Sequence, residues 1–151
     1  MIASTVWNNL VSTLENNPTL SKYVKYVFQG IRWDIGPESL PCIMLEPISN
    51  GETEKDFNIV ENVYLALDLI AFSSQSLKDF KKPIVGNADY KGILDIDNDI
   101  RGCLASSYTL GDTVIDIRLD KTNFDSVDMG KGPVRGLRIP IKILYRQTDG
   151  V

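Results

Sequence analysis

Residues 59–73 read IVENVYLALDLIAFS and residues 137–145 read LRIPIKILY, and these two stretches decide the fold class. In the first stretch, one alternating set of side chains is wholly apolar: Val63, Leu65, Leu67, Leu69 and Ala71. The residues between them are mostly apolar too, which predicts a central strand covered on both faces over part of its length.

The second stretch also has strand periodicity, with one apolar face and one charged face. The apolar set is Leu137, Ile139, Ile141, Ile143 and Tyr145. The opposite set includes Arg138, Lys142 and Arg146 and predicts a face turned to solvent or to a partner. Because proline cannot donate a ladder hydrogen bond, Pro140 predicts that this strand lies at an edge or carries a bulge.

The remaining elements are placed outward from these strands. Helical spacing of apolar residues predicts helices over residues 2–16 and 93–104. A short helix after Pro18 is expected to give way to a strand ending near Trp33. Two further strands are expected over residues 40–48 and 113–119, and the second of these should pair with the last strand as a hairpin.

The predicted order is therefore helix, three strands, helix and two strands. We expect a single α+β domain over residues 1–151, with a mixed, mainly antiparallel sheet of about five strands and two helices packed on one face. Long hairpin arms are expected at residues 49–58 and 120–134, because both segments are longer than ordinary hairpin connections.

The composition excludes several classes of function. The chain has a net charge of −4, no histidine and two cysteines, Cys42 and Cys103. We therefore expect no specific nucleic-acid binding, no membrane span, no signal peptide, and two reduced, buried thiols. No phosphate-binding glycine loop is expected, because Gly130, Gly132 and Gly136 lead into a strand and suit a flexible hairpin.

Two apparent metal sites fail on their spacing. Asp95, Asp97 and Asp99 resemble the start of a calcium loop, but Ile100 stands where glycine is needed and Ser106 where glutamate is needed. A solvated helix face is the better interpretation. A nuclease site would use strand carboxylates and a lysine, here Glu46, Asp68, Asp116 and Lys142, but their adjacency is wrong. We expect no catalytic residue, metal or cofactor.

The two arms carry isolated apolar side chains among charges. They are Phe57 in the first arm and Phe124, Val127 and Met129 in the second. Such side chains either fold back onto their own core or anchor on another subunit. The candidate interface therefore comprises Phe57, Phe124, Val127, Met129, Arg138 and Lys142.

Four segments together carry a family resemblance. They are Leu40-Pro41-Cys42-Ile43-Met44-Leu45, Val63-Tyr64-Leu65-Ala66-Leu67-Asp68, Asp116-Ile117-Arg118 and the RG-x-x-IPI-x-I-x-Y run from Arg135 to Tyr145. With the N-terminal helix, they resemble the tail terminator (tail completion, or tail-to-head joining) proteins of long-tailed bacteriophages and prophages.

This resemblance implies an α+β protein without enzymatic activity or cofactor that forms a hexameric ring. The ring caps the tail tube, stops its polymerisation and docks on the head connector. Its expected partners are thus its own copies, the tail tube protein and the head-tail connector protein. The expected location is the tail-head junction of the virion, and the host bacterial cytoplasm during assembly. Another phage neck protein, such as a head-completion or stopper factor, and a metal-dependent nuclease or ligand-binding domain remain the alternatives.

Overall fold

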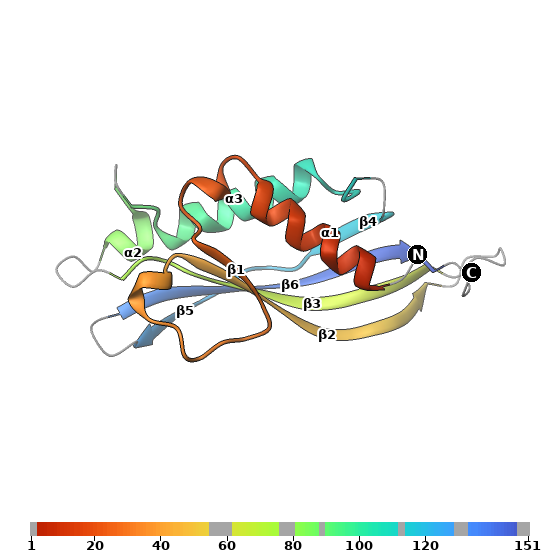
Figure 1. Cartoon of the computed structure of the whole chain (residues 1–151), viewed down its shortest axis with the longest axis horizontal. Coiled ribbons are helices and arrows are strands. Elements are labelled where there is room, and N and C mark those ends of the chain that lie inside the picture. Colours follow the sequence, from red (N-terminus) through yellow and green to blue (C-terminus); the bar gives the residue numbers. More distant parts are fainter. Residues whose placement is uncertain are drawn as a thin grey trace.

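The structure, a computed structural model, describes residues 3–54, 62–75, 81–87, 90–111, 114–128 and 133–147. The described chain has three α-helices and six strands (Figure 1). The helices are α1 (Ala3–Asn16), α2 (Lys82–Val85) and α3 (Ile93–Ser106), with short 3₁₀ helices η1 (Leu20–Lys22) and η2 (Pro37–Ser39). The strands are β1 (Tyr26–Gln29), β2 (Cys42–Glu54), β3 (Asn62–Phe72), β4 (Asp116–Leu119), β5 (Asn123–Asp128) and β6 (Pro133–Arg146).

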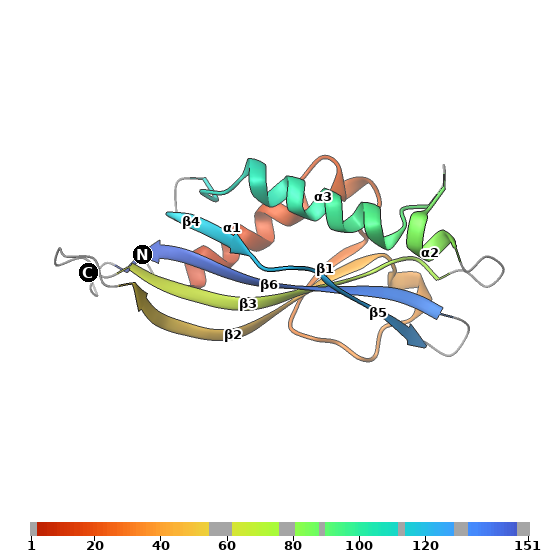
Figure 2. The same ribbon diagram turned by 180° about the vertical axis from the view of Figure 1, so that it is seen from behind.

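The strands form one sheet in the order β1-β2-β3-β6-β4. The strand β5 also pairs with β6, so β4 and β5 follow one another along the same side of that strand (Figure 2). All pairs are antiparallel except β1 with β2. The predicted α+β class with a mainly antiparallel sheet is confirmed.

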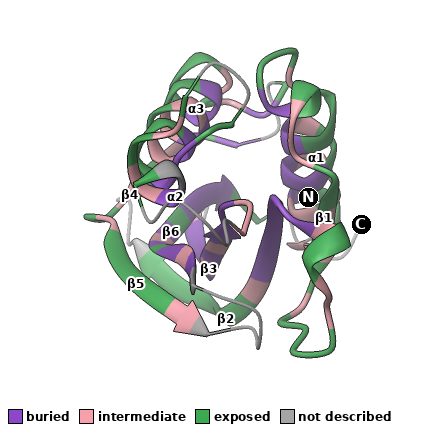
Figure 3. Ribbon diagram, turned by 90° about the vertical axis from the view of Figure 1, so that its left-hand side faces the viewer, coloured by how far each residue is buried: buried purple, intermediate pink, exposed green. Residues whose placement is uncertain are grey.

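The helices α1 and α3 lie on the same face of the sheet and bury their apolar sides against it (Figure 3). Their spacing explains this, because one stripe of each helix is apolar. The buried residues are Val6, Leu10, Val11 and Leu14 in α1 and Ile93, Ile96, Ile100, Cys103 and Leu104 in α3. Trp7 at the edge of this layer donates its indole N–H to the Gln29 side chain at 2.8 Å.

The main core lies between these helices and one set of strand residues. Leu67 of β3 stands opposite Ile141 of β6, and Leu69 stands opposite Ile139. All four side chains are buried. The predicted apolar faces of both strands are therefore the faces that pack under the helices.

Several predicted boundaries are wrong. The expected arm at 49–58 begins inside a strand, because β2 continues to Glu54, and residues 55–58 lie outside the described residues. The expected arm at 120–134 contains the strand β5, which makes six strands instead of about five. The first strand was expected to end near Trp33, but it ends at Gln29. The next residue, Gly30, has a positive φ of 95° and turns the chain.

The last strand lies in the interior of the sheet, so the edge position predicted from Pro140 is wrong. The N–H of Asp120 donates to the carbonyl of Pro140 at 2.9 Å, so the backbone of Pro140 faces the junction between β4 and β5. β4 pairs with β6 up to Ile141, and β5 pairs from Arg138. The proline is one of the two residues of β6 between these neighbours, where a missing N–H does not interrupt either ladder.

Among the described residues, no α-helix lies over the second face of the sheet. At one end, the segment 30–41 with η2 folds under this face, as Figure 1 shows in orange. It covers a smaller apolar cluster that contains Leu40, Cys42, Met44, Phe72 and Val134. The described residues leave the rest of this face uncovered, and we call the whole of this face the open face.

Candidate interaction surface

The open face carries an apolar groove beside the covered end. The groove has a volume of about 270 Å³. Its walls include Trp33, Ile70, Phe72, Phe124, Val127 and Arg138. Trp33 is 83% exposed and Phe124 is 47% exposed, although both are large apolar side chains. The register pairs Phe124 with Leu137, whose side chain packs under the helices, so the Phe124 side chain points to that side and Trp33 supplies the exposed ring over the groove. An exposed aromatic side chain beside an apolar groove is typical of a protein-interaction surface.

An aromatic row continues along β1 on the same face. The rings of Tyr26 and Phe28 stack with centroids 5.2 Å apart, and the Arg32 guanidinium lies 5.1 Å from the Phe28 centroid. The parallel register places these rings beside Cys42 and Met44, which belong to the cluster under the segment 30–41. The covered end of the open face is therefore rich in aromatic side chains.

The other half of the open face carries paired charges around Tyr64. The Arg118 guanidinium and the Lys142 ammonium lie 5.3 and 5.7 Å from the Tyr64 ring centroid. Lys142 pairs with Glu52 at 3.1 Å and Arg118 pairs with Asp116 at 3.4 Å. Because Arg118 and Lys142 each have an acidic partner, these two cations add little net charge to this half.

Arg138 joins the two halves, since it lines the groove and pairs with Asp68 at 3.3 Å. Of the six predicted interface residues, Phe124, Val127 and Arg138 line the same groove and Lys142 lies on the same face. Phe57 and Met129 lie outside the described residues.

The sequence analysis missed the contribution of Trp33 and Tyr64. Trp33 was assigned to the end of a strand, but it follows Gly30 in the segment that folds under the open face. The combination of a glycine, a Gly36-Pro37 turn and a tryptophan between two charges could have indicated an exposed loop. No short-range signal marks Tyr64, because its neighbours come from β4 and β6.

Three backbone N–H groups along the outer edge formed by β4, β5 and the bend between them bond to aspartate side chains. The N–H of Ile117 donates to the carboxylate of Asp116 at 2.9 Å. The same bond joins Lys121 to Asp120 at 2.7 Å and Ser126 to Asp125 at 2.8 Å. In each case an aspartate binds the amide of the following residue. Such bonds compete with an added strand for the same donors.

At the opposite edge, the pairing of β1 with β2, a proline and two register shifts hinder the addition of another strand. β1 pairs with β2 over Cys42–Leu45, and the carbonyl of Leu45 accepts from Gly30 on that side at 2.7 Å. Pro47, two residues on, faces the same side and has no N–H to offer. Register shifts follow between Pro47 and Ser49 and between Asn50 and Glu52. Together these features disfavour the strand addition that a long, regular edge would invite.

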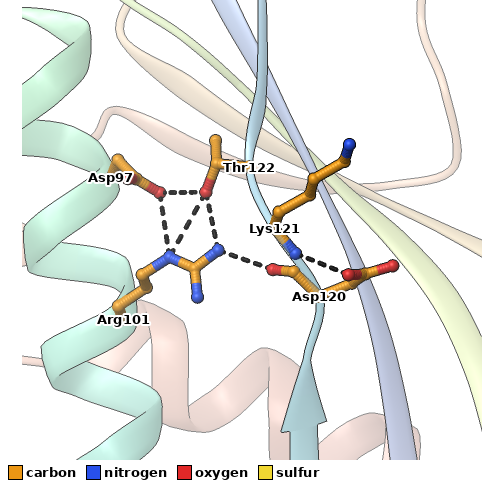
Figure 4. Close-up of polar contacts among 5 residues, drawn as sticks. All are labelled: Asp97, Arg101, Asp120, Lys121 and Thr122. Carbon is orange, nitrogen blue, oxygen red and sulfur yellow. Dashed lines mark hydrogen bonds and ion pairs between the residues drawn. The ribbon is translucent and has the colours of Figure 1, made fainter.

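Arg101 fixes the bend between β4 and β5 to the helix layer (Figure 4). Its guanidinium donates to the Asp120 carbonyl at 2.6 Å and to the Thr122 hydroxyl at 2.8 Å. It also lies 3.3 Å from the Asp97 carboxylate, to which the Thr122 hydroxyl donates at 2.6 Å. The bend is therefore held by side chains as well as by the β6 ladder.

The predicted metal-site alternatives are separated or occupied by protein groups. Asp68 and Asp116 each pair with an arginine, and Glu46 accepts the N–H of Ile31 at 2.9 Å. Among the described residues, no three acidic or cysteine side chains gather as metal ligands.

The aspartates of the possible calcium loop lie on α3, as the helix interpretation predicts. Asp99 accepts a hydrogen bond from the Tyr23 hydroxyl at 2.8 Å and pairs with Lys91 at 3.4 Å. Burial and the Asp99 carboxylate raise the pKa of Tyr23 above its ordinary value of 10.0.

Both cysteines are free and buried, as predicted. Burial raises the pKa of the Cys42 thiol to about 12 from an ordinary value of 9.0. It also raises the pKa of Cys103, whose thiol lies on the helix side at 3.9 Å from the Thr13 carbonyl. These thiols are packing groups, since a neutral buried thiol is a poor nucleophile.

None of the described helices is both long and apolar enough to span a bilayer. No family model matches the sequence. A search of curated proteins also finds no match.

Proposed function

We propose that this chain is a non-enzymatic virion assembly protein of the tail terminator type. It would form a ring of its own copies, cap the tail tube, stop its polymerisation and dock the tail to the head connector. The family resemblance of the four sequence segments supports this function. The observation that carries it is the open face, where an apolar groove beside the exposed Trp33 adjoins paired charges.

The open face suits assembly because it presents a broad surface on which most charged side chains are paired. A stable contact between proteins needs an apolar centre and a polar rim. The groove supplies the centre, and the pairs Glu52–Lys142, Asp68–Arg138 and Asp116–Arg118 supply the rim. An acidic chain with paired cations is also suited to a channel through which DNA must slide without sticking.

The mass of the native particle tests this proposal. The chain has a mass of 16.9 kDa, so light scattering should give about six times this value, and negative-stain microscopy should show rings. Purified rings added to growing tail tubes should stop their elongation and remain at one tube end. A protein that stays monomeric at high concentration with tail tubes present contradicts the proposal.

The same experiment separates the alternatives. A head-completion or stopper factor would bind filled heads and leave tube growth unchanged. A metal-dependent nuclease would cut DNA with Mg²⁺, and the Asp68→Asn and Asp116→Asn variants would lose that cleavage.

A further inference from the structure

We propose that, between neighbouring copies, the open face of one copy packs on the outer surface of α1 and α3 of the next. In this contact Trp33 enters the cleft between the two helices of its neighbour. The inference rests on the self-assembly proposed above and adds which two surfaces meet.

The open face, together with the segment 30–41 over its end, approaches the area that such a contact needs. With strands about 4.8 Å apart and a rise of about 3.3 Å per residue, four strands over the length of β3 span on the order of 600–700 Å², and the segment 30–41, which carries Trp33, covers one end of this area. A stable interface of standard size buries roughly 800 Å² on each partner. A sheet face of this size is ordinarily covered by a second layer.

The outer surface of α1 and the C-terminal end of α3 carry little charge, whereas Asp95, Asp97, Asp99 and Arg101 lie on the earlier turns of α3. Glu15 is the one charged residue of α1. The exposed positions of α1 are otherwise Ser4, Thr5, Asn8, Ser12 and Asn16. On α3, Gly102 and Ala105 are exposed near the C-terminal end. Depletion of charge is the compositional mark of an interface centre.

Between the helices lies a cleft of about 690 Å³, and none of the described residues that line it is charged. Its lining includes Asn9, Ser12, Thr13, Asn16, Ser106 and Ser107. These side chains offer amide and hydroxyl oxygens around a neutral space. An indole suits such a space, because it has a large apolar body and a single N–H donor. Trp33 is the most exposed of the large hydrophobic residues that the structure describes, at 83%.

The same contact supplies an occupant for the groove beside Trp33. Tyr108 follows the cleft residues Ser106 and Ser107 in sequence and is 56% exposed. One aromatic side chain matches the groove volume of about 270 Å³. The open face thus carries Trp33 and the groove, and the helix layer carries Tyr108 and the cleft.

The position of the two surfaces determines the type of assembly. They lie on opposite faces of the sheet (Figure 3). A contact between two different surfaces is heterologous, and heterologous contacts close into rings when the rotation permits. Strand addition is an unsuitable route here, because the aspartates on β4–β5 and Pro47 on β2 protect both edges.

The test uses one variant for each surface. Trp33→Ala removes the anchor, and Ser12→Arg places a charge in the cleft. Arginine is a better helix former than serine, and Ser12 is exposed, so the second variant should fold. The matched controls are Ser21→Arg, an exposed serine on η1 outside the cleft lining and outside α1 and α3, and Val85→Ala, an exposed apolar residue on α2.

Light scattering should show native rings for the controls and a 16.9 kDa monomer for each single variant. Mixing the two variants should give a dimer of twice that mass. The intact open face of the Ser12→Arg copy can bind the intact cleft of the Trp33→Ala copy, and both outer surfaces are then blocked. Circular dichroism checks that each variant is folded.

Intact rings from both variants overturn this contact and leave the ring function standing. A mixture of folded variants that remains monomeric, or assembly lost in Trp33→Ala but kept in Ser12→Arg, also overturns it. A monomeric wild type in the presence of tail tubes overturns both the contact and the function.

Discussion

Near the β4–β5 bend, Arg101 forms hydrogen bonds with three different kinds of acceptor. Its guanidinium bonds to a carboxylate, a hydroxyl and a backbone carbonyl from two elements. The Asp97 carboxylate is 16% exposed and depends on this cation and on Thr122. Removal of the cation would leave a half-buried carboxylate with one donor.

We therefore expect Arg101→Ala to lower the free energy of unfolding by about 1–3 kcal/mol. The control is Arg118→Ala, because the Arg118–Asp116 pair is about half exposed on each side, at 56% and 46%, and such pairs contribute less than about 1 kcal/mol. Urea titration at constant pH measures both. Equal losses in the two variants would show that the bend does not depend on Arg101.

At the scale of the elements, the outer strands combine pairing on one side with protection on the other. β4 and β5 each pair with β6. On the side away from β6, the amides of Ile117 on β4, Lys121 in the bend and Ser126 on β5 each bond to the preceding aspartate. The recurrence of this bond along two strands indicates protection of the edge.

Replacing Asp116, Asp120 and Asp125 together by alanine should expose the edge and cause strand-mediated self-association. The expected result is a concentration-dependent shift to high-mass species that bind thioflavin T, measured by sedimentation and fluorescence. The matched control replaces the same three residues by asparagine, which removes the charge but keeps a side-chain oxygen that can accept the amide. If the asparagine variant aggregates as much as the alanine variant, charge repulsion protects the edge and the hydrogen bonds do not.

At the scale of the whole molecule, the sequence predicted the layers better than the order of strands. The alternation in residues 63–71 and 137–145 identified the buried faces, and helical spacing identified α1 and α3. These signals are local and periodic, so they can be read from one sequence.

The features missed by the sequence analysis depend on contacts between distant segments. Asn123–Asp128 is polar enough to resemble a loop, and it is a strand because β6 provides a ladder beside it. Pro140 suggested an edge, but the junction of β4 and β5 opposite it was not visible locally. The groove was predicted in part through Phe124, Val127 and Arg138, but Trp33 reaches it through the fold of the segment 30–41.

The buried ionisable groups make the stability of the whole molecule fall at high pH. The folded state holds the Cys42 proton up to pH about 12, while the unfolded thiol loses it near 9.0. Stability from this group is therefore complete below pH 9 and is lost as the pH rises toward 12. Cys103 and Tyr23, whose pKa values are also raised, act in the same direction.

We expect the free energy of unfolding to fall between pH 9 and 11, with Cys42 contributing up to about 1.4 kcal/mol per pH unit. Urea titrations at several pH values measure the slope. The Cys42→Ala variant should show a shallower slope, because one of the three groups is gone. An unchanged slope in that variant would contradict the assignment.

The burial of both thiols has a practical consequence for mapping assemblies. The chain has two cysteines, and neither presents a thiolate to solvent near neutral pH. Maleimide reagents should therefore ignore the native protein and modify a newly introduced cysteine selectively. A mixture of one variant with a cysteine at Asp34, beside the Trp33 anchor, and another with a cysteine at Ser12 could then report, by covalent cross-linking between subunits, whether these two surfaces touch in the native particle.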